Sequence, residues 1–188
     1  MSGWSRASAL RRGIATRRTP AAGLTAGLLL AGSLGAGFGS ALAAQQVGIA
    51  AGAVPEATVL EDLEGSPVDL ADYIGRGPVL VQFWATWCEV CEALEPRLRA
   101  ASERWGEDVE FLLVAVGVNQ NPRRIRRYMD DHPLHGRVLW DGRGRAARSF
   151  MAPTTGYLVV LDAAGRVVYT GVGEDQEFEP ALARVAGD

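Results

Sequence analysis

The hydrophobic positions in the second half of the chain fall into two kinds of run. Residues 78–85 and 109–118 are almost continuously apolar, which is typical of strands covered on both faces. Between them, residues 88–105 have the spacing of a helix with one apolar face, and Gly106 ends this helix. The apolar residues on that face are Val90, Leu94, Leu98 and Ala101. This order predicts a sheet with a helix packed across it.

The alternation continues to the end of the chain with shorter elements. The pattern predicts a helix that begins at Asn121, then a strand and a short helix, and finally a hairpin and a last helix. The inner face of the helix that begins at Asn121 carries Ile125, Tyr128 and Met129. The expected strand covers residues 138–140, and the short helix after it ends at about residue 150. The strands of the hairpin are expected at 157–161 and 166–171, and the last helix at about 176–185.

The pattern is weaker before the first long strand. Short apolar segments at 57–60 and 68–70 flank a turn at 64–67, and residues 70–74 have the pattern of a single helical turn. Together the elements predict an α/β domain over residues 57–188, with a mixed sheet and helices on both faces.

The first 43 residues have the pattern of a secretory signal. Five arginines and no acidic residue come first, and an apolar run from about residue 21 ends in Ala41-Leu42-Ala43. The alternative is an uncleaved membrane anchor, because the run approaches the ~20 apolar residues that span a bilayer. Its six glycines favour cleavage after Ala43, and either reading places the domain outside the cytoplasm. Residues 44–56 are small and lack periodicity, so we expect a flexible linker there.

The charge of the exported part limits its chemistry. Cleavage would leave 145 of the 188 residues and remove five of the 19 basic residues, so 14 basic and 22 acidic residues remain, a net charge of −8. All the basic residues are arginine, and the absence of lysine excludes Schiff-base chemistry. The acidic balance argues against a nucleic-acid partner. We expect one monomeric globular domain.

The function depends on the only two cysteines, Cys88 and Cys91, for which three interpretations are open. A zinc site would need two more ligands, and the only histidines, His132 and His135, lie 40 residues away at a spacing shorter than zinc motifs use. A structural disulfide across a two-residue gap would constrain the unfolded chain very little. The third interpretation is a redox-active pair, and its surroundings favour it.

The position of Cys88 carries the redox interpretation. Cys88 lies between a buried strand and the start of a helix, where backbone N–H groups and the positive end of the helix dipole stabilise a thiolate. This thiolate would attack a disulfide, and Cys91, one turn deeper, would resolve the mixed disulfide. Trp87 would add a partly exposed apolar surface beside the sulfur, with packing in the core as the alternative for this side chain.

Three motifs also carry a family resemblance. They are residues 83–91 (FWATWCEVC) followed by Pro96, residues 152–158 (APTTGYL) and residues 161–166 (LDAAGR). Over residues 54–188 the chain resembles the exported TlpA/ResA-like thiol–disulfide oxidoreductases of the thioredoxin superfamily. The resemblance implies a thioredoxin-like three-layer α/β/α sandwich. It also implies a cis peptide bond before Pro153, contact of Pro153 with the cysteine pair, and backbone pairing of Ala152 with an extended substrate segment.

Two positions depart from this family. Many thioredoxins have a buried Asp in the strand before the motif, which accepts the proton of the resolving cysteine, and this chain has Gln82 there. Relatives that support cytochrome c maturation often have a Glu where this chain has Leu94. We therefore expect Glu95 or a water molecule to carry the proton. Glu89, between the cysteines, would oppose ionisation of the Cys88 thiol.

These observations predict an exported thiol–disulfide oxidoreductase that works in the periplasm, or on the outer face of the cytoplasmic membrane, without a metal or other cofactor. The resemblance favours reduction of protein disulfides, with a membrane electron donor that restores the dithiol. It implies apocytochrome c or copper-site proteins as substrates, beside a general reductase role. The competing hypothesis is a non-catalytic chaperone that binds copper through its thiols, and tight Cu(I) binding without turnover would distinguish it.

Overall fold

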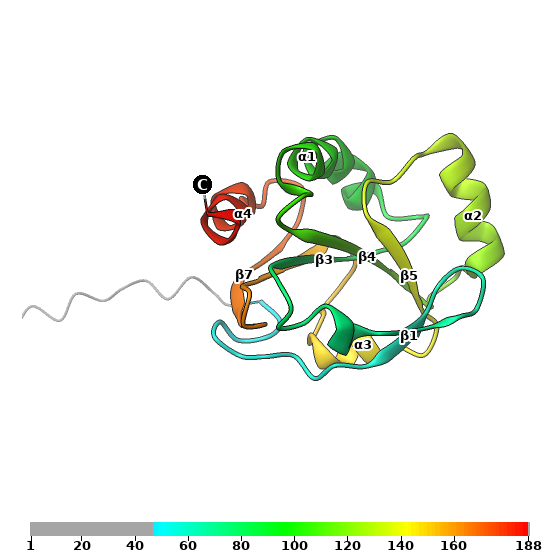
Figure 1. The fold of residues 1–188 in the computed structure, drawn as a ribbon. Helices are drawn as coiled ribbons and strands as arrows, with labels where there is room; N and C mark the ends of the chain where they lie inside the picture. Colours follow the sequence, from blue (N-terminus) through cyan, green and yellow to red (C-terminus); the bar gives the residue numbers. More distant parts are fainter. Residues whose placement is uncertain (1–46, 188) are drawn as a thin grey trace, which may run out of the picture. The chain divides into compact units, whose positions relative to one another are not determined.

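The computed structural model describes residues 47–187 (Figure 1). The signal or anchor predicted for residues 1–43 lies outside this range. The strands are β1 (Val59–Glu61), β2 (Pro67–Asp69), β3 (Val79–Trp84), β4 (Glu110–Val116), β5 (Arg137–Asp141), β6 (Tyr157–Leu161) and β7 (Val167–Val172). The helices are the 3-10 turn η1 (Leu70–Asp72) and α1 (Glu89–Trp105), α2 (Pro122–Asp131), α3 (Arg145–Ser149) and α4 (Glu179–Ala186). Within the described range, no helix has both the length and the apolar character needed to cross a bilayer.

The strands of the described range form one mixed sheet in the order β2-β1-β5-β4-β3-β6-β7. The neighbours β3, β4 and β5 run parallel, whereas the pairs β3–β6, β6–β7, β1–β2 and β1–β5 are antiparallel. The central strand β3 is buried along its whole length, as its continuous apolar run predicts. The mixed central sheet expected from the sequence is confirmed.

Alternate residues of β3 face opposite layers of the fold. Val79, Val81 and Phe83 pack in the core that contains the buried residues of α3. Leu80 packs with the buried faces of α1 and α4, and Trp84 packs with the inner residue of α2. Figure 1 shows α1, α2 and α4 on one side of the sheet and α3 on the other. The predicted three-layer α/β/α sandwich is therefore confirmed.

A segment expected to be a linker is part of the folded domain. The phenol oxygen of Tyr157 accepts a hydrogen bond of 3.1 Å from the backbone N–H of Ile49, whose side chain is only 5% exposed. Backbone hydrogen bonds of 2.8 and 2.9 Å join Gly52 and Ala53 to Val167 of β7. The prediction of a flexible linker over residues 44–56 is therefore wrong for residues 49–53. The small residues of this segment show no periodicity because Tyr157 and β7, which are distant in the sequence, hold the segment in place.

The same contact explains the glycine before Ile49. Gly48 has a φ of +81°, a conformation that favours glycine. A Cβ atom at this position would lie 2.1 Å from the phenol oxygen of Tyr157. Only glycine therefore lets the chain pass close enough to Tyr157 for the Ile49 hydrogen bond to form.

Candidate active site

The candidate site lies at the carboxyl end of β3. Because β3, β4 and β5 are parallel, their carboxyl ends meet at one edge of the sheet, the edge at which α/β proteins bind their ligands. Beyond Trp84 the chain makes a single turn and enters α1, with Cys88 as the N-cap residue. The structure therefore places Cys88 at the entrance of the helix.

The two cysteines are joined by a disulfide, with their Cα atoms 5.2 Å apart. The backbone N–H of Cys91 donates a hydrogen bond of 3.1 Å to the sulfur of Cys88. Cys88 is 9% exposed and Cys91 is 6% exposed, so Cys88 is the slightly more accessible of the two. The N–H donor and the positive end of a 17-residue helix would both stabilise negative charge on the Cys88 sulfur.

The loop that follows β4 holds the motif in place. The indole N–H of Trp87, whose side chain is 42% exposed, donates to the carbonyl oxygen of Val118 at 2.8 Å. The backbone N–H of Thr86 donates to the side-chain oxygen of Gln120 at 2.9 Å, and the amide nitrogen of Gln120 donates to Val116 at 2.7 Å. Sequence reasoning missed Gln120, although its position just after a strand parallel to β3 could have indicated it.

A groove of about 440 Å³ joins the motif to the loop before β6. Trp87 and Val118 line one part of it, and Ala152 and Thr154 line another. The structure thus brings together two of the predicted substrate-binding residues, Trp87 and Ala152. Pro153 is exposed and lies between two lining residues. Its cis peptide bond and its contact with the sulfurs stay predictions.

The surroundings of this groove expose large apolar side chains. Val118 is 54% exposed and Met151, next to Ala152, is 62% exposed. Met151 also has a φ of +49°, which non-glycine residues rarely adopt and which is most common at functional sites. The backbone N–H of Gly156 donates to the carbonyl oxygen of Phe83 at 2.8 Å and so anchors the loop to β3. An exposed apolar surface beside a reactive pair is typical of a surface that binds another molecule.

A second cavity, of about 380 Å³, is lined by Cys91. Gln82 and Glu95 also line it, so the structure brings two of the three predicted supporting residues to one side of the disulfide, whereas Glu89 does not line this cavity. Three buried polar atoms of its lining residues have no hydrogen-bond partner among residues 47–187: Gln82 Nε2, Trp84 Nε1 and Glu95 Oε1. Buried polar groups are normally paired with protein atoms or water, so this cavity is a place where water molecules would bind.

Two groups that line this cavity, the Glu95 carboxyl and the Tyr128 phenol, have a raised pKa, and burial is the main cause in both. Burial raises the pKa of the Glu95 carboxyl from 4.5 to about 7, against the opposing effects of a hydrogen bond from the His135 backbone and the charge of Arg99. The His135 Nε2 atom lies 4.0 Å from Glu95 Oε1. His132 lines the same cavity, yet within residues 47–187 no three His, Cys, Asp or Glu side chains are placed to share a metal ion.

The model of one protein family, Redoxin, matches residues 49–185. The match begins at Ile49, the residue at which the buried core of the described range also begins. This chain belongs to the Redoxin family. The family assignment covers both the cysteine motif and the loop before β6.

Individual relatives of this Redoxin protein agree with that assignment. The thiol-disulfide oxidoreductase ResA of Bacillus thuringiensis subsp. konkukian is 25% identical over 130 residues, which cover 68% of this chain and 73% of ResA. The thioredoxin-like protein YneN of Bacillus subtilis is 26% identical over 159 residues, 82% of this chain and 92% of YneN. The solved thioredoxin domain of a thiol-disulfide oxidoreductase from Bacteroides vulgatus has a TM-score of 0.63 at 19% identity and covers 73% of this chain and 99% of that domain. The predicted membership of the thioredoxin superfamily, among ResA-like proteins, is confirmed.

One of the two departures from the family pattern, Leu94, has a structural explanation in this Redoxin protein. Leu94 is fully buried and packs against residues of α4, so a carboxylate at this position would be surrounded by apolar side chains. The next residue, Glu95, is the one that lines the cavity together with Cys91. Glu89 is exposed in the first turn of α1, where water screens its effect on the Cys88 sulfur.

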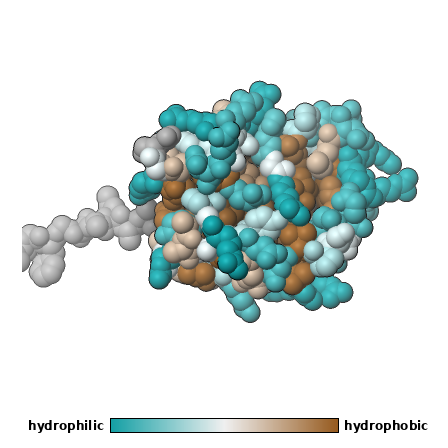
Figure 2. All heavy atoms as spheres, viewed as in Figure 1, coloured by the Kyte–Doolittle hydropathy of each residue, from teal (hydrophilic) through white to brown (hydrophobic). Residues whose placement is uncertain are grey.

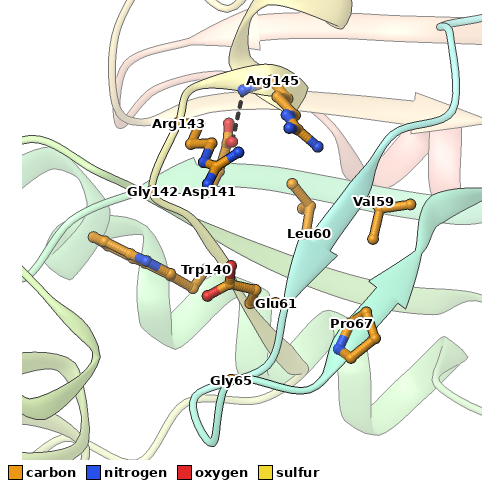
Figure 3. A pocket seen from close by; sticks show the side chains of 10 residues that line it. All are labelled: Val59, Leu60, Glu61, Gly65, Pro67, Trp140, Asp141, Gly142, Arg143 and Arg145. Atoms are coloured by element: carbon orange, nitrogen blue, oxygen red, sulfur yellow. Dashed lines mark hydrogen bonds between the residues drawn. The ribbon is translucent and has the colours of Figure 1, made fainter.

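A third cavity, of about 440 Å³, contains none of the predicted site residues (Figure 3). It lies between the β1–β2 hairpin and the end of β5. The buried carboxylate of Asp141 accepts hydrogen bonds from the backbone N–H groups of Arg145 at 2.7 Å and Ala147 at 2.9 Å. Asp141 therefore caps the first turn of α3, and this Redoxin protein uses the residue for stability.

Proposed function

We propose that this protein is an exported thiol–disulfide oxidoreductase that reduces protein disulfides through a dithiol–disulfide cycle of Cys88 and Cys91. The observation that carries the proposal is the backbone N–H of Cys91, which points at the Cys88 sulfur at the entrance of α1. The similarity to ResA of B. thuringiensis, named a thiol-disulfide oxidoreductase, supports it. The groove beside Trp87 provides a surface for the substrate.

The first step is attack by the Cys88 thiolate on one sulfur of a substrate disulfide. The substrate S–S bond breaks, a mixed disulfide forms between Cys88 and the substrate, and the leaving thiolate takes a proton from water. The substrate segment occupies the groove between Trp87 and Ala152, where the backbone of Ala152 pairs with it.

The second step releases the reduced substrate. The Cys91 thiol loses its proton, and the resulting thiolate attacks the Cys88 sulfur and displaces the second substrate thiolate, which is then protonated. Two electrons and two protons have then passed to the substrate, and the Cys88–Cys91 disulfide has formed. Glu95 accepts the Cys91 proton through water in their common cavity, because a carboxyl with a pKa of about 7 both takes up and releases protons near neutral pH.

The cycle needs a donor that reduces the disulfide again. We place the protein in the periplasm, or on the outer face of the cytoplasmic membrane, because residues 1–43 have the pattern of an export signal. Glutathione and thioredoxin keep thiols reduced in the cytosol, so an exported dithiol depends on electrons carried across the membrane. A membrane protein with a dithiol is therefore the donor. The substrates are proteins awaiting cytochrome c or copper-site assembly or, in a general reductase role, other periplasmic proteins with disulfides.

Replacement of Cys91 by serine tests the proposal directly. The reduced Cys91→Ser protein should form a one-to-one covalent adduct with a protein disulfide, because Cys88 can attack but nothing resolves the mixed disulfide. The adduct should survive electrophoresis without reductant, disappear with dithiothreitol, and map to Cys88 by mass spectrometry. A Cys88→Ser/Cys91→Ser double variant is the control and should form none. If the single variant also forms no adduct, the protein is not a disulfide exchange enzyme.

Replacement of Glu95 by glutamine should slow the second step by about 100-fold or more at pH 7, because the proton acceptor for Cys91 is lost. In the unaltered protein the resolving rate should rise with pH through an inflection near 7, where Glu95 ionises, and the variant should lack this inflection. Rapid mixing of the reduced protein with a disulfide peptide over pH 5–9 would measure both properties. A purely structural role for Glu95 would lower the rate without changing the shape of the profile.

The same substitution, which should slow the second step, should make the protein more stable near neutral pH. The folded-state pKa of Glu95 is raised, so its stabilising contribution is present below pH 4.5 and is lost as pH rises towards 7. The unaltered protein should therefore lose roughly 1–3 kcal/mol in its free energy of unfolding between those pH values, and Glu95→Gln should not show this loss. The matched control is Glu103→Gln on the exposed side of α1, which should change neither the rate profile nor the pH dependence. Equal behaviour of the two variants would exclude Glu95 as the proton carrier.

A further inference from the structure

The first half of α2 concentrates positive charge on a domain that is otherwise acidic. Four of the 14 arginines after residue 43 lie within the five positions 123–127, whereas the same part of the chain has a net charge of −8. An acidic polypeptide is therefore repelled by most of the surface and attracted to this helix. Figure 2 shows hydrophilic residues over the side of the molecule where Figure 1 places α2.

Three of these arginines line an open cavity of about 600 Å³. They are Arg123, Arg124 and Arg127. Across residues 47–187, none of the three forms an ion pair, and the hydrogen bond of Arg124 to the Asn119 carbonyl is long, at 3.5 Å. The fourth arginine, Arg126, donates instead to the carbonyl oxygen of Leu63. Asp131 is the one carboxylate that lines the cavity, so three guanidinium groups face a single negative charge.

This cavity adjoins the cysteine pair. Thr86 also lines it, and Thr86 lies two residues before Cys88, so their Cα atoms are at most about 7.6 Å apart. The hydrogen bond from the Thr86 backbone N–H to the Gln120 side chain holds Thr86 in this position. A segment bound beside Thr86, at this end of the cavity, therefore reaches Cys88 within two to four residues of extended chain, at about 3.3 Å per residue.

The spacing of the arginines indicates which conformation and which spacing of acidic residues a bound segment would have. Arg123 and Arg127 are four helical positions apart, which corresponds to a rise of about 6 Å. In an extended chain, alternate side chains point the same way and are about 6.7 Å apart. Two acidic residues separated by one other residue therefore match the two arginines, each of which pairs with a carboxylate through parallel hydrogen bonds.

We propose that Arg123, Arg124 and Arg127 form a docking surface for an acidic, extended segment of the redox partner, with acidic residues in alternate positions two to four residues from the reacting cysteine. One part of this inference rests on the proposed function, namely that the docked segment carries a cysteine that reacts with Cys88. Docking of this kind increases the rate of encounter and is weakened by salt, because the charges are exposed to solvent.

Two synthetic peptides test the proposal with the full-length reduced chain. Each contains one intramolecular disulfide, flanked by Glu-Ser-Glu in one peptide and by Gln-Ser-Gln in the other. At low ionic strength the Glu peptide should oxidise the protein with a second-order rate constant about 10-fold larger than that of the Gln peptide. Addition of 0.5 M NaCl, for which the Debye length is below about 8 Å, should remove most of this difference.

Charge reversal locates the effect. The Arg123→Glu/Arg127→Glu variant should lose the preference for the Glu peptide and react with the Gln peptide at an unchanged rate. The matched control, Arg76→Glu/Arg184→Glu, changes the net charge by the same amount at exposed residues outside α2 and should keep the preference. Equal rates for the two peptides, or equal losses in the two variants, would overturn the docking surface.

A binding measurement separates this inference from the proposed function. The Glu peptide with serines in place of its cysteines cannot exchange disulfides, and its affinity can be followed by fluorescence anisotropy. If neither disulfide peptide oxidises the protein, the proposed function fails. The docking surface still holds in that case if the serine peptide binds and the Arg123→Glu/Arg127→Glu variant loses at least about 10-fold in affinity, and it fails if the peptide does not bind or the variant binds it equally well.

Discussion

Replacement of Cys88 by serine is expected to lower the rate of disulfide reduction by at least about 10³-fold, a loss typical of removing a covalent nucleophile. A serine hydroxyl is not ionised near neutral pH, and the donors at the entrance of α1 cannot compensate for a missing thiolate. Cys91 cannot substitute for it, because Cys91 lies deeper in the site and is the only other cysteine of the chain. The measurement is the first-step rate with a cystine peptide in excess.

The matched control for this prediction is Cys91→Ser. Both variants lack the disulfide and one sulfur, so any general loss of stability is shared between them. Only Cys88→Ser should lose the first step, whereas Cys91→Ser should complete it once and then stop. The reverse pattern would show that the two cysteines have exchanged roles. Retention of activity by Cys88→Ser would place the nucleophile elsewhere.

Replacement of Phe83 by alanine is expected to reduce the free energy of unfolding by about 3–5 kcal/mol. The Phe83 ring is fully buried, and its centroid lies 5.5 Å from that of Phe150 and 5.9 Å from that of Tyr157. The substitution would leave a cavity between β3, α3 and β6, and the two remaining aromatic rings cannot close it by small shifts. Thermal unfolding should show a decrease of roughly 10–15 °C in Tm.

An exposed residue provides the comparison for Phe83. Val54 is 52% exposed, and its replacement by alanine should change the free energy of unfolding by less than about 0.5 kcal/mol. Because Phe83 also accepts the hydrogen bond from Gly156 through its carbonyl oxygen, the side-chain substitution should leave that backbone contact in place. A loss below about 1 kcal/mol in Phe83→Ala would mean that the three rings are not packed as described.

The sequence predicted the central elements well, for a physical reason. β3 and β4 are covered on both faces, so nearly all of their residues are apolar, and the helical spacing of α1 follows from its single buried face. The last helix begins at Glu179 and not near residue 176, because the side-chain amide of Gln176 donates to the carbonyl oxygens of Gly156 and Gly173. These bonds hold the segment outside the helix, and no local pattern shows the bond to Gly156, which lies 20 residues earlier in the chain.

The candidate site was predictable only in its local part. Cys88 and Trp87 follow from the motif and its place between a strand and a helix. The role of Gln120 and the exposure of Met151 depend on how loops from different strands meet. The cavity that unites Gln82 with Cys91 and Glu95 likewise depends on tertiary packing, so the sequence identified the residues without their common surroundings.

The attachment of Ile49 to the domain would limit how far the domain can move from the membrane if residues 1–43 are the uncleaved anchor that one interpretation of the sequence predicts. Five residues separate Ile49 from the predicted cleavage point after Ala43. A fully extended chain spans about 3.3–3.6 Å per residue, so this stretch reaches no more than about 20 Å. With residues 1–43 held in the membrane, this short connection would restrict the enzyme to substrates at the lipid surface. Cleavage after Ala43 would let it diffuse through the whole compartment.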